Sequence, residues 1–275
     1  MAERTATNTN FKKKKITMDL RIKNQLFIVG GATSGFGKAI ANSLINEGAS
    51  IIAVARNPDK LNELKSSAPS QIETVAGDIT QDEIIEKITA TVGQRQLHGV
   101  LVNAGGPPAK TFLETTLEDW DNAYKNILRW KINITQQVVP KMKEHQYGRI
   151  VYIESSSVKQ PLENLVLSNS IRLAVVGFVK TLSQEIAKTG ITLNVMGPGS
   201  HDTPAIERLY TKKSEQTGIS AADARQQGIQ QIPVGRLGSP DDFASLATWL
   251  LSPASGYITG QTITVDGGMV KSIFG

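Results

Sequence analysis

The sequence predicts an α/β fold, a single doubly wound domain with a parallel sheet of about seven strands and helices on both faces. Apolar, strand-like runs alternate with helix-like segments along most of the 275 residues. The first apolar run ends in a cluster of glycines directly before a helix-like segment. The ends of six predicted strands are rich in Gly, Asn, Asp, Ser and Arg, which indicates a ligand site at one edge of the sheet.

Each element follows from the hydrophobic pattern and from turn residues. Strands are expected at 25–30, 50–55, 72–76, 99–103, 149–153, 191–195 and 261–265. Helices are expected at 37–48, from 57 onward, and at 81–92, 117–144, 165–188 and 241–251. Residues 200–232 are polar and poor in strand signals, so we expect a helical excursion or lid over the site.

The stretch from Leu26 to Gly37 is the strongest local signal. Its glycines follow the spacing Gly31-x-x-x-Gly35-x-Gly37. Glycine permits a positive φ and close approach of a pyrophosphate, and a following helix N-terminus offers free N–H groups. The spacing favours nucleotide binding, although a glycine-rich turn without a ligand remains the alternative.

Charge and composition limit the other classes of function. The formal net charge is +5, and residues 1–24 carry all of that excess. We therefore expect a basic flexible leader at 1–24 and one domain at 25–275. The run Lys12–Lys15 is typical of a solvated leader, so neither a nucleic acid nor a membrane partner is expected. The chain has no cysteine and three scattered histidines, so no metal site is expected.

Several ordered motifs together carry a family resemblance. They are Gly31-x-x-x-Gly35-x-Gly37, Gly77-Asp78, Asn103-Ala104-Gly105, Gly148 to Val151, Asn194-x-x-x-Pro198-Gly199 and Val265 to Gly268. Over nearly all of residues 24–270 the chain resembles the short-chain dehydrogenase/reductase superfamily, and within it the 3-oxoacyl-(acyl-carrier-protein) reductase-like proteins. The resemblance implies a Rossmann fold, a cytoplasmic enzyme and assembly into a homodimer or homotetramer through the helix at 165–188 and the long helix before it.

The resemblance also implies which residues bind a dinucleotide. The phosphate loop would consist of Gly31, Gly35 and Gly37, lined by Thr33, Ser34 and Phe36. Asp78 would meet the adenine edge, and the adenosine ribose would lie against Asn103, Ala104 and Gly105. The nicotinamide carboxamide would be held by Pro198, Gly199 and Thr203.

Arg56 indicates the type of dinucleotide. It directly follows the second predicted strand, where an acidic residue would bind the free ribose hydroxyls of NAD. Here the pair is Ala55-Arg56, and a guanidinium suits a 2′-phosphate. The sequence therefore predicts NADP(H) in preference to NAD(H), with a solvent-facing arginine as the alternative.

The catalytic pattern of the superfamily is broken. Its members normally carry Tyr-x-x-x-Lys with a serine earlier in the chain. Ser155 fits the serine position, but Ser168 and Arg172 replace the tyrosine and the lysine. The expected asparagine of the preceding helix falls on Ile127, with Asn126 one residue away and Asn133 further on.

This departure changes the expected chemistry. A serine hydroxyl is a far weaker acid than a phenol, and arginine stays protonated. Arg172 could instead bind ribose hydroxyls, a phosphate or a substrate carboxylate, and Ser155 could donate a hydrogen bond to a carbonyl oxygen. Lys159 is the first candidate for a replacement acid, and the others are Glu154, His201, Tyr152 and Tyr210.

We expect an NADP(H)-dependent oxidoreductase that interconverts a carbonyl and an alcohol by hydride transfer. The substrate would be a small or carrier-bound molecule. One alternative is an NADP(H)-binding sensor or scaffold without redox turnover. The other is a lyase or isomerase that reuses the same pocket, with Arg172 holding an anionic substrate.

Overall fold

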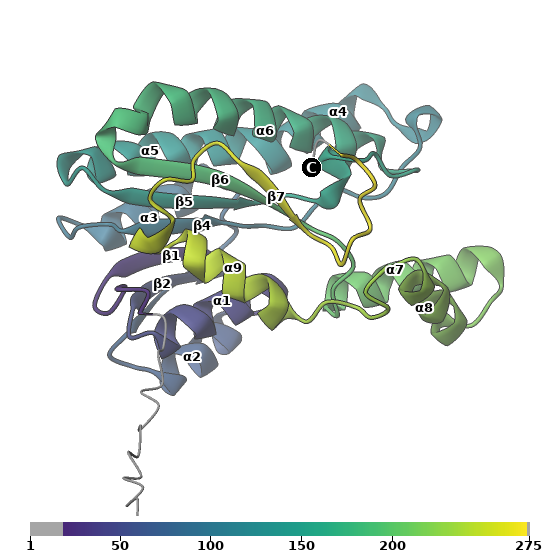
Figure 1. Ribbon diagram of the computed structural model, residues 1–275, viewed down its shortest axis with the longest axis horizontal. Helices are drawn as coiled ribbons and strands as arrows, with labels where there is room; N and C mark the ends of the chain where they lie inside the picture. The colour runs from purple at the N-terminus through teal and green to yellow at the C-terminus, as the bar shows by residue number, and fades with distance from the viewer. Residues whose placement is uncertain (1–18, 274–275) are drawn as a thin grey trace, which may run out of the picture.

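The central feature is a parallel sheet of seven strands in the order β3-β2-β1-β4-β5-β6-β7 (Figure 1). The computed structural model describes residues 19–273. Its strands are β1 (Leu26–Gly30), β2 (Ser50–Ala55), β3 (Ile72–Ala76), β4 (Gly99–Val102), β5 (Gly148–Ile153), β6 (Ile191–Pro198) and β7 (Thr262–Val265). The strand order reverses between β1 and β4, as a doubly wound sheet requires. The predicted fold class is confirmed.

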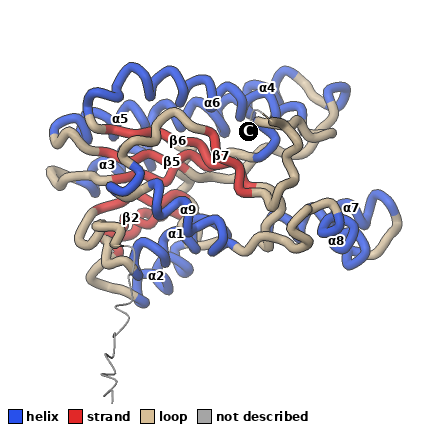
Figure 2. Tube along the Cα trace, viewed as in Figure 1, coloured by secondary structure: helices blue, strands red, loops and turns tan. Residues whose placement is uncertain are grey.

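Helices cover both faces of this sheet (Figure 2). They are α1 (Gly35–Asn46), α2 (Pro58–Ser67), α3 (Asp82–Val92), α4 (Leu117–Ala123), α5 (Trp130–Glu144), α6 (Val166–Ile186), α7 (Pro204–Thr217), α8 (Ala221–Gln230) and α9 (Pro240–Leu250). One buried cluster joins the sheet to α1, α2 and α9, and a second joins it to α3, α5 and α6. Each face therefore has its own hydrophobic core.

Strand β5 shows how this two-sided burial positions later residues. All six of its residues are buried. Ile150 and Tyr152 belong to the core on the α5 and α6 side, whereas Val151 and Ile153 belong to the opposite core. Side chains alternate between the two faces of a strand. The next residue in that alternation, Glu154, therefore follows Tyr152 toward α5 and α6.

The long helical region predicted at 117–144 contains a change of helix type. A π-helical stretch, Tyr124–Arg129, separates α4 from α5 without a break in the chain's helical path. Such π-turns often occur at functional sites. Hydrophobic periodicity alone does not reveal this local widening, because it adds one residue to a turn and leaves the apolar stripe nearly intact.

The polar segment 200–232 forms α7 and α8, which stand apart from the main body of the molecule (Figure 1). The two helices pack against each other, and Gly228 of α8 lies close to the ring of Tyr210 on α7. This confirms the expected helical excursion. Only the beginning of α7 approaches the sheet's ligand edge, as described below.

The folded domain begins before the predicted boundary at residue 25. Ile22 is 1% exposed and packs in the core beside α1, and the backbone N–H of Asn24 donates to the carbonyl of Gly48 at 2.8 Å. Ile22 and Asn24, which the predicted leader at 1–24 includes, therefore pack against the folded domain. Residues 1–18, including Lys12–Lys15, lie outside the described residues.

Helix α6 is the most apolar long helix of the described chain. By length and composition it is apolar enough to cross a membrane, as core helices of many globular proteins also are. Val175 and Val179 of α6 are buried in the core that the helix shares with the sheet. This packing accounts for part of its apolar character, since about a third of the apolar stretch is buried.

Candidate active site

A cleft of about 940 Å³ lies at the carboxyl ends of the strands, where the strand order reverses. Ligands of open α/β sheets bind at such a switch point. Most residues predicted to bind the dinucleotide line it: Gly31, Thr33, Ser34, Gly35, Phe36, Arg56, Asp78, Asn103, Ala104, Gly105, Pro198 and Thr203. The structure therefore brings together residues spread from position 31 to position 203 of the sequence.

The glycine loop connects β1 to α1 at one wall of this cleft. Gly31 and Gly35 have φ values of +66° and +49°, which other residues adopt only with strain. A Cβ on Gly37 would collide with the carbonyl of Gly31, so helix and strand pack too closely there for any side chain. Gly35 and Phe36, the first residues of α1, line the cleft, and the first N–H groups of a helix have no partners within it. A glycine loop before a helix N-terminus is an arrangement suited to phosphate groups.

Asn103 fixes the bottom of the cleft. Its side-chain Nδ2 donates to the carbonyl of Gly30 at 3.0 Å, which ties the end of β4 to the end of β1. Asp78 follows β3, and its Oδ1 accepts from the backbone N–H and the hydroxyl of Thr80 at 3.0 and 2.9 Å. These contacts hold both side chains at the cleft wall.

A basic corner lies beside the end of β2. Arg56 lines the cleft and is exposed, and Lys60 on the first turn of α2 lines it as well. Asn57 caps α2 by accepting from the Lys60 N–H at 3.0 Å. Our sequence reasoning missed Lys60, although its position four residues after Arg56 was a usable signal. A helix N-terminus with two cations suits a phosphate group.

The opposite end of the cleft is formed by the last residue of β6 and by the residues that follow this strand. Pro198 and Thr203 line it, whereas Gly199 lies behind the wall, packed so tightly on Asp266 that a Cβ would overlap it. Phe36 is fixed here by aromatic contacts, with ring centroids 5.0 Å from His201 and 4.3 Å from Phe243. Gly199, predicted to hold the nicotinamide carboxamide, is thus not among the described residues that line the cleft, and its contact is with Asp266.

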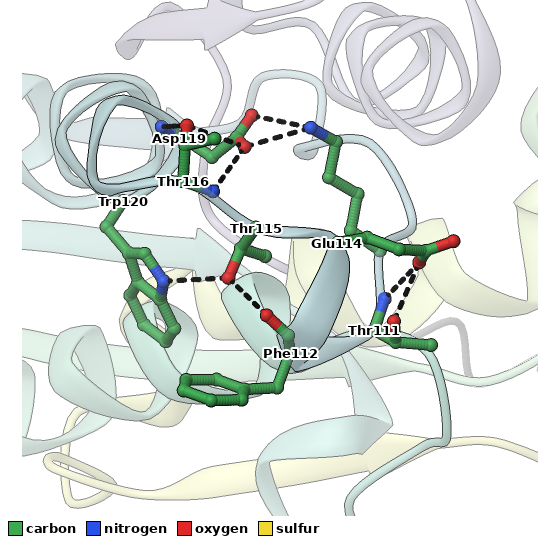
Figure 3. A network of polar contacts seen from close by, with 8 residues as sticks. Thr111, Phe112, Glu114, Thr115, Thr116, Asp119 and Trp120 are labelled. Atoms are coloured by element: carbon green, nitrogen blue, oxygen red, sulfur yellow. Dashed lines mark hydrogen bonds and ion pairs between the residues drawn. The ribbon is translucent and has the colours of Figure 1, made fainter.

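A loop at 104–110 closes the same end. Gly105, Gly106, Pro107 and Pro108 line the cleft. Lys110 anchors the loop to Asp119 of α4, and Figure 3 shows Asp119 beside Thr116. The Lys110 ammonium lies 2.9 Å from both carboxylate oxygens of Asp119. Asp119 also accepts from the backbone N–H of Thr116 in a capping box. The single cleft-lining carboxylate of α4 is therefore fully engaged.

A buried group of three charged side chains lies beside this end of the cleft; we call Lys131, Glu154 and Arg172 the buried triad. Glu154 follows β5, and its Oε1 pairs with the ammonium of Lys131 on α5. Its Oε2 accepts from Nη1 of Arg172 on α6 at 2.9 Å. Nε of Arg172 donates to the hydroxyl of Ser168 at 3.0 Å. Glu154 and Arg172 line the cleft.

Burial governs the electrostatics of the triad. The side chains of Lys131 and Glu154 are 3% and 0% exposed, and that of Arg172 is 11% exposed. Burial lowers the pKa of Lys131 to about 8, because removal from water penalises its charged form and Arg172 repels it. Our sequence reasoning missed Lys131. A lysine within the apolar stripe of Ile127, Trp130 and Ile134 was the available signal.

Comparison with known proteins identifies the family to which the chain belongs. A family model described as enoyl-(acyl carrier protein) reductase matches residues 31–270. A 3-oxoacyl-(acyl-carrier-protein) reductase, FabG, of Thermotoga maritima is 32% identical over 261 residues, covering 91% of this chain and 100% of that protein. The chain belongs to the short-chain dehydrogenase/reductase superfamily, in its 3-oxoacyl-(acyl-carrier-protein) reductase-like branch.

Other relatives extend this result. The NADPH-dependent reductase BacG of Bacillus subtilis is 30% identical over 262 residues, covering 91% of this chain and 99% of that protein. The solved structure of L-sorbose reductase from Gluconobacter frateurii, complexed with NADPH and L-sorbose, superimposes with a TM-score of 0.87 at 28% identity. It covers 93% of this chain and 100% of that one. An actinorhodin polyketide ketoreductase with NADPH gives a TM-score of 0.85 at 30% identity, covering 90% and 98%.

In this short-chain dehydrogenase/reductase, the two serines predicted to be catalytic stand beside the cleft wall. Neither Ser155 nor Ser168 is among the described residues that line the cleft. The hydroxyl of Ser155 accepts from the N–H of Ser157 at 3.1 Å, and that of Ser168 accepts from Arg172. Each hydroxyl acts as an acceptor in these bonds, so its own O–H remains a donor.

The structure also shows where the candidates for a replacement acid lie relative to the cleft. Lys159 is half-buried at the end of the short turn Ser156–Val158 and does not line the cleft, within the part of the chain that the structure describes. Tyr152 is fully buried, its hydroxyl is 2.7 Å from that of Thr135, and burial raises its pKa. Burial also lowers the pKa of His201, which is enclosed by aromatic rings, and raises that of Tyr210. Of the candidates, only Glu154 belongs to the cleft wall.

The π-helical stretch presents a polar side chain to the cleft. Asn126 lines it, whereas Ile127, which the family register predicts at the asparagine position, is buried. Asn133 lies elsewhere and donates to Asp82 at 2.7 Å. Of the two asparagines considered from the sequence, Asn126 lies at the cleft and Asn133 does not; Asn122 of α4 lines the cleft as well.

Proposed function

We propose that this protein is an NADP(H)-dependent oxidoreductase that reduces a carbonyl compound to an alcohol. One observation carries the proposal: a single cleft at the switch point combines the glycine loop, the bridging Asn103 and the basic corner of Arg56 and Lys60. The relatives described above are reductases, and BacG and the two solved structures are named with NADPH. This favours the redox hypothesis over a sensor, lyase or isomerase.

The residues present fit a bound NADP(H). The N-terminus of α1 and the loop Gly31–Gly37 would hold the pyrophosphate, and Arg56 with Lys60 would hold the 2′-phosphate. Thr203 and Pro198 would orient the nicotinamide end. When bound, the cofactor supplies the hydride. Everything else at the reacting centre must come from the protein and from water.

The chemical roles of the site residues follow from the charge that develops on the substrate's carbonyl oxygen. Hydride transfer places negative charge on the carbonyl oxygen, and a nearby guanidinium or hydroxyl donor stabilises that charge. We assign this task to Ser155 and Ser168, whose O–H donors are available, and to the field of the buried triad. Lys159 remains part of the proposal as a group that could deliver a proton from solvent. Arg172 stays charged throughout.

The assembly is part of the proposal as well. Leu173 of α6 is 53% exposed, and Phe112, Leu113 and Leu117, which precede and begin α4, are exposed too. We propose that these apolar side chains are covered in a homodimer or homotetramer, and we keep the cytoplasmic location as an expectation. The substrate would be a small or carrier-bound carbonyl compound.

Titration of the purified protein with NADPH and NADH, followed by cofactor fluorescence, tests the cofactor assignment. The proposal expects NADPH to bind about tenfold or more tightly than NADH, since a charge-assisted phosphate contact contributes on the order of 1.5–3 kcal/mol. Equal affinities would contradict the role of the basic corner. Failure of both nucleotides to bind would contradict the function itself.

A further inference from the structure

Arg172 is the member of the buried triad that faces the cleft. Its Nε and Nη1 are engaged by Ser168 and Glu154. Its Nη2 points to the loop glycine Gly106, where a Cβ would lie only 2.7 Å from it. Gly106 and Arg172 both line the cleft. Ser168 and Glu154 thus fix the guanidinium through Nε and Nη1, and Nη2 carries N–H donors on the side of Gly106.

The charges of the triad do not cancel. Two cations, Lys131 and Arg172, share the single carboxylate of Glu154, which leaves one positive charge in a place nearly closed to water. An uncompensated buried charge is costly. The lowered pKa of Lys131 has the same origin, since burial and Arg172 both oppose its protonation.

No other carboxylate of the cleft compensates this charge. The described lining residues include two further acids, Asp78 and Asp119. Asp119 is bound to Lys110 through both oxygens, and Asp78 bonds to Thr80 after β3. Arg208, in the second turn of α7, adds another cation to the lining.

We propose that Arg172 binds a carboxylate of the substrate, so that the natural substrates are short oxo acids, whose carbonyl and carboxylate lie close together. This rests on the proposed function and specifies its substrate class. An incoming carboxylate supplies the missing negative charge, and a guanidinium held on one face is suited to recognise it by charge-assisted hydrogen bonds. A thioester on an acyl carrier has no free carboxylate near its carbonyl, so free acids are preferred to carrier-bound substrates.

Glu154 and Lys131 act as positioning residues in this account. Glu154 holds Nη1 of Arg172 and thereby directs Nη2 to the cleft. Lys131 occupies the second oxygen of Glu154 and adds the charge that the substrate neutralises. Lys131→Met removes one of the two positive charges of the triad. It is therefore expected to weaken carboxylate binding, while the binding of a neutral ketone stays unchanged.

The test measures binding without turnover. The protein is saturated with NADP⁺ and titrated by calorimetry with acetoacetate and methyl acetoacetate, and separately with pyruvate and methyl pyruvate. Cofactor and ligand are both oxidised, so no hydride transfer takes place. In at least one pair the acid should bind on the order of tenfold more tightly than its ester. Esters that bind as tightly as their acids in both pairs would overturn the inference.

Variants separate Arg172 from general charge effects. Arg172→Gln should remove the preference for the acid while the affinity for NADP⁺, measured first, stays within about twofold. Arg172→Lys keeps the charge and should retain part of the preference, which controls for misfolding. Arg129→Gln removes an arginine paired with Asp82 outside the cleft and should leave the preference unchanged. If Arg172→Gln weakens NADP⁺ and leaves the acid preference intact, Arg172 serves the cofactor ribose and the inference fails.

The same series distinguishes this inference from the proposed function. Absence of NADP⁺ and NADPH binding would remove the proposed function, and with it the basis of the inference. Normal NADPH binding with turnover of neutral ketones, but no preference for acids, would leave the function intact and refute the substrate class alone.

Discussion

Lys131 is the residue whose environment departs furthest from that of an ordinary surface lysine. It is 3% exposed and pairs with Glu154. Burial places its pKa at about 8, below the usual value for lysine. Removal of one partner of a buried ion pair is generally more costly than the pair's net contribution, because the remaining charge stays buried. Lys131 and Glu154 are therefore expected to be interdependent.

This predicts a pH-dependent contribution to stability. Because the pKa of Lys131 is lower in the folded chain than in the unfolded chain, the unfolded chain binds more protons between about pH 8 and pH 10. The free energy of unfolding that Lys131 contributes should therefore rise with pH across this window, by an amount on the order of 1–3 kcal/mol. Urea denaturation of the wild type and Lys131→Met at several pH values measures the difference. A difference that stays flat or falls would contradict the assigned environment.

Arg56 carries the second prediction at this scale. It stands at the exposed basic corner beside Lys60. Arg56→Gln should weaken NADPH binding about tenfold and leave NADH binding unchanged, because only NADPH carries the 2′-phosphate. Lys65→Gln, in the last turn of the nearby helix α2, removes a charge outside the cleft and serves as the control. An equal loss for both nucleotides would show that Arg56 does not contact the 2′-phosphate.

At the scale of elements, the strand β1, its glycine loop and helix α1 form the most constrained unit. Gly37 has no room for a Cβ, because the carbonyl of Gly31 occupies the space. Gly37→Ala should therefore lower the free energy of unfolding by about 2–4 kcal/mol and abolish NADPH binding. Lys38→Ala, at the next and exposed position of α1, should change stability by less than about 0.5 kcal/mol. Unaltered stability and binding in Gly37→Ala would show that the loop packs differently.

Strands and helices were predictable because their patterns are local. Alternation of apolar runs gave β2 and β3 at their observed bounds, and the glycine spacing predicted the strand-turn-helix unit. The π-helical stretch and Lys131 were not predictable in this way. Periodicity treats 117–144 as one helix, and only the tertiary structure places Lys131 against Glu154 of a distant strand. Ser168 and Arg172 were found through the family register, whereas their partner Glu154 was one of several candidates.

At the scale of the whole molecule, the sheet order brings the ends of β1, β4, β5 and β6 to one cleft and leaves apolar side chains on α6 exposed. We predict a dimer or tetramer by light scattering after gel filtration. Leu173→Glu should shift the protein toward a smaller species, because it places a charge in the proposed interface. The wild type eluting as a monomer at all concentrations would contradict this assembly.

Hydride transfer is the central step of the proposed function, and the oxidation of NADPH measures it directly. The purified protein is mixed with NADPH and a panel of short oxo acids, their methyl esters and neutral ketones, and the near-ultraviolet absorbance of NADPH is followed with time. The account predicts that NADPH is consumed with at least one oxo acid, that NADH is a poorer reductant, and that the alcohol forms in equal amount. Tight NADPH binding without oxidation by any member of the panel would contradict it.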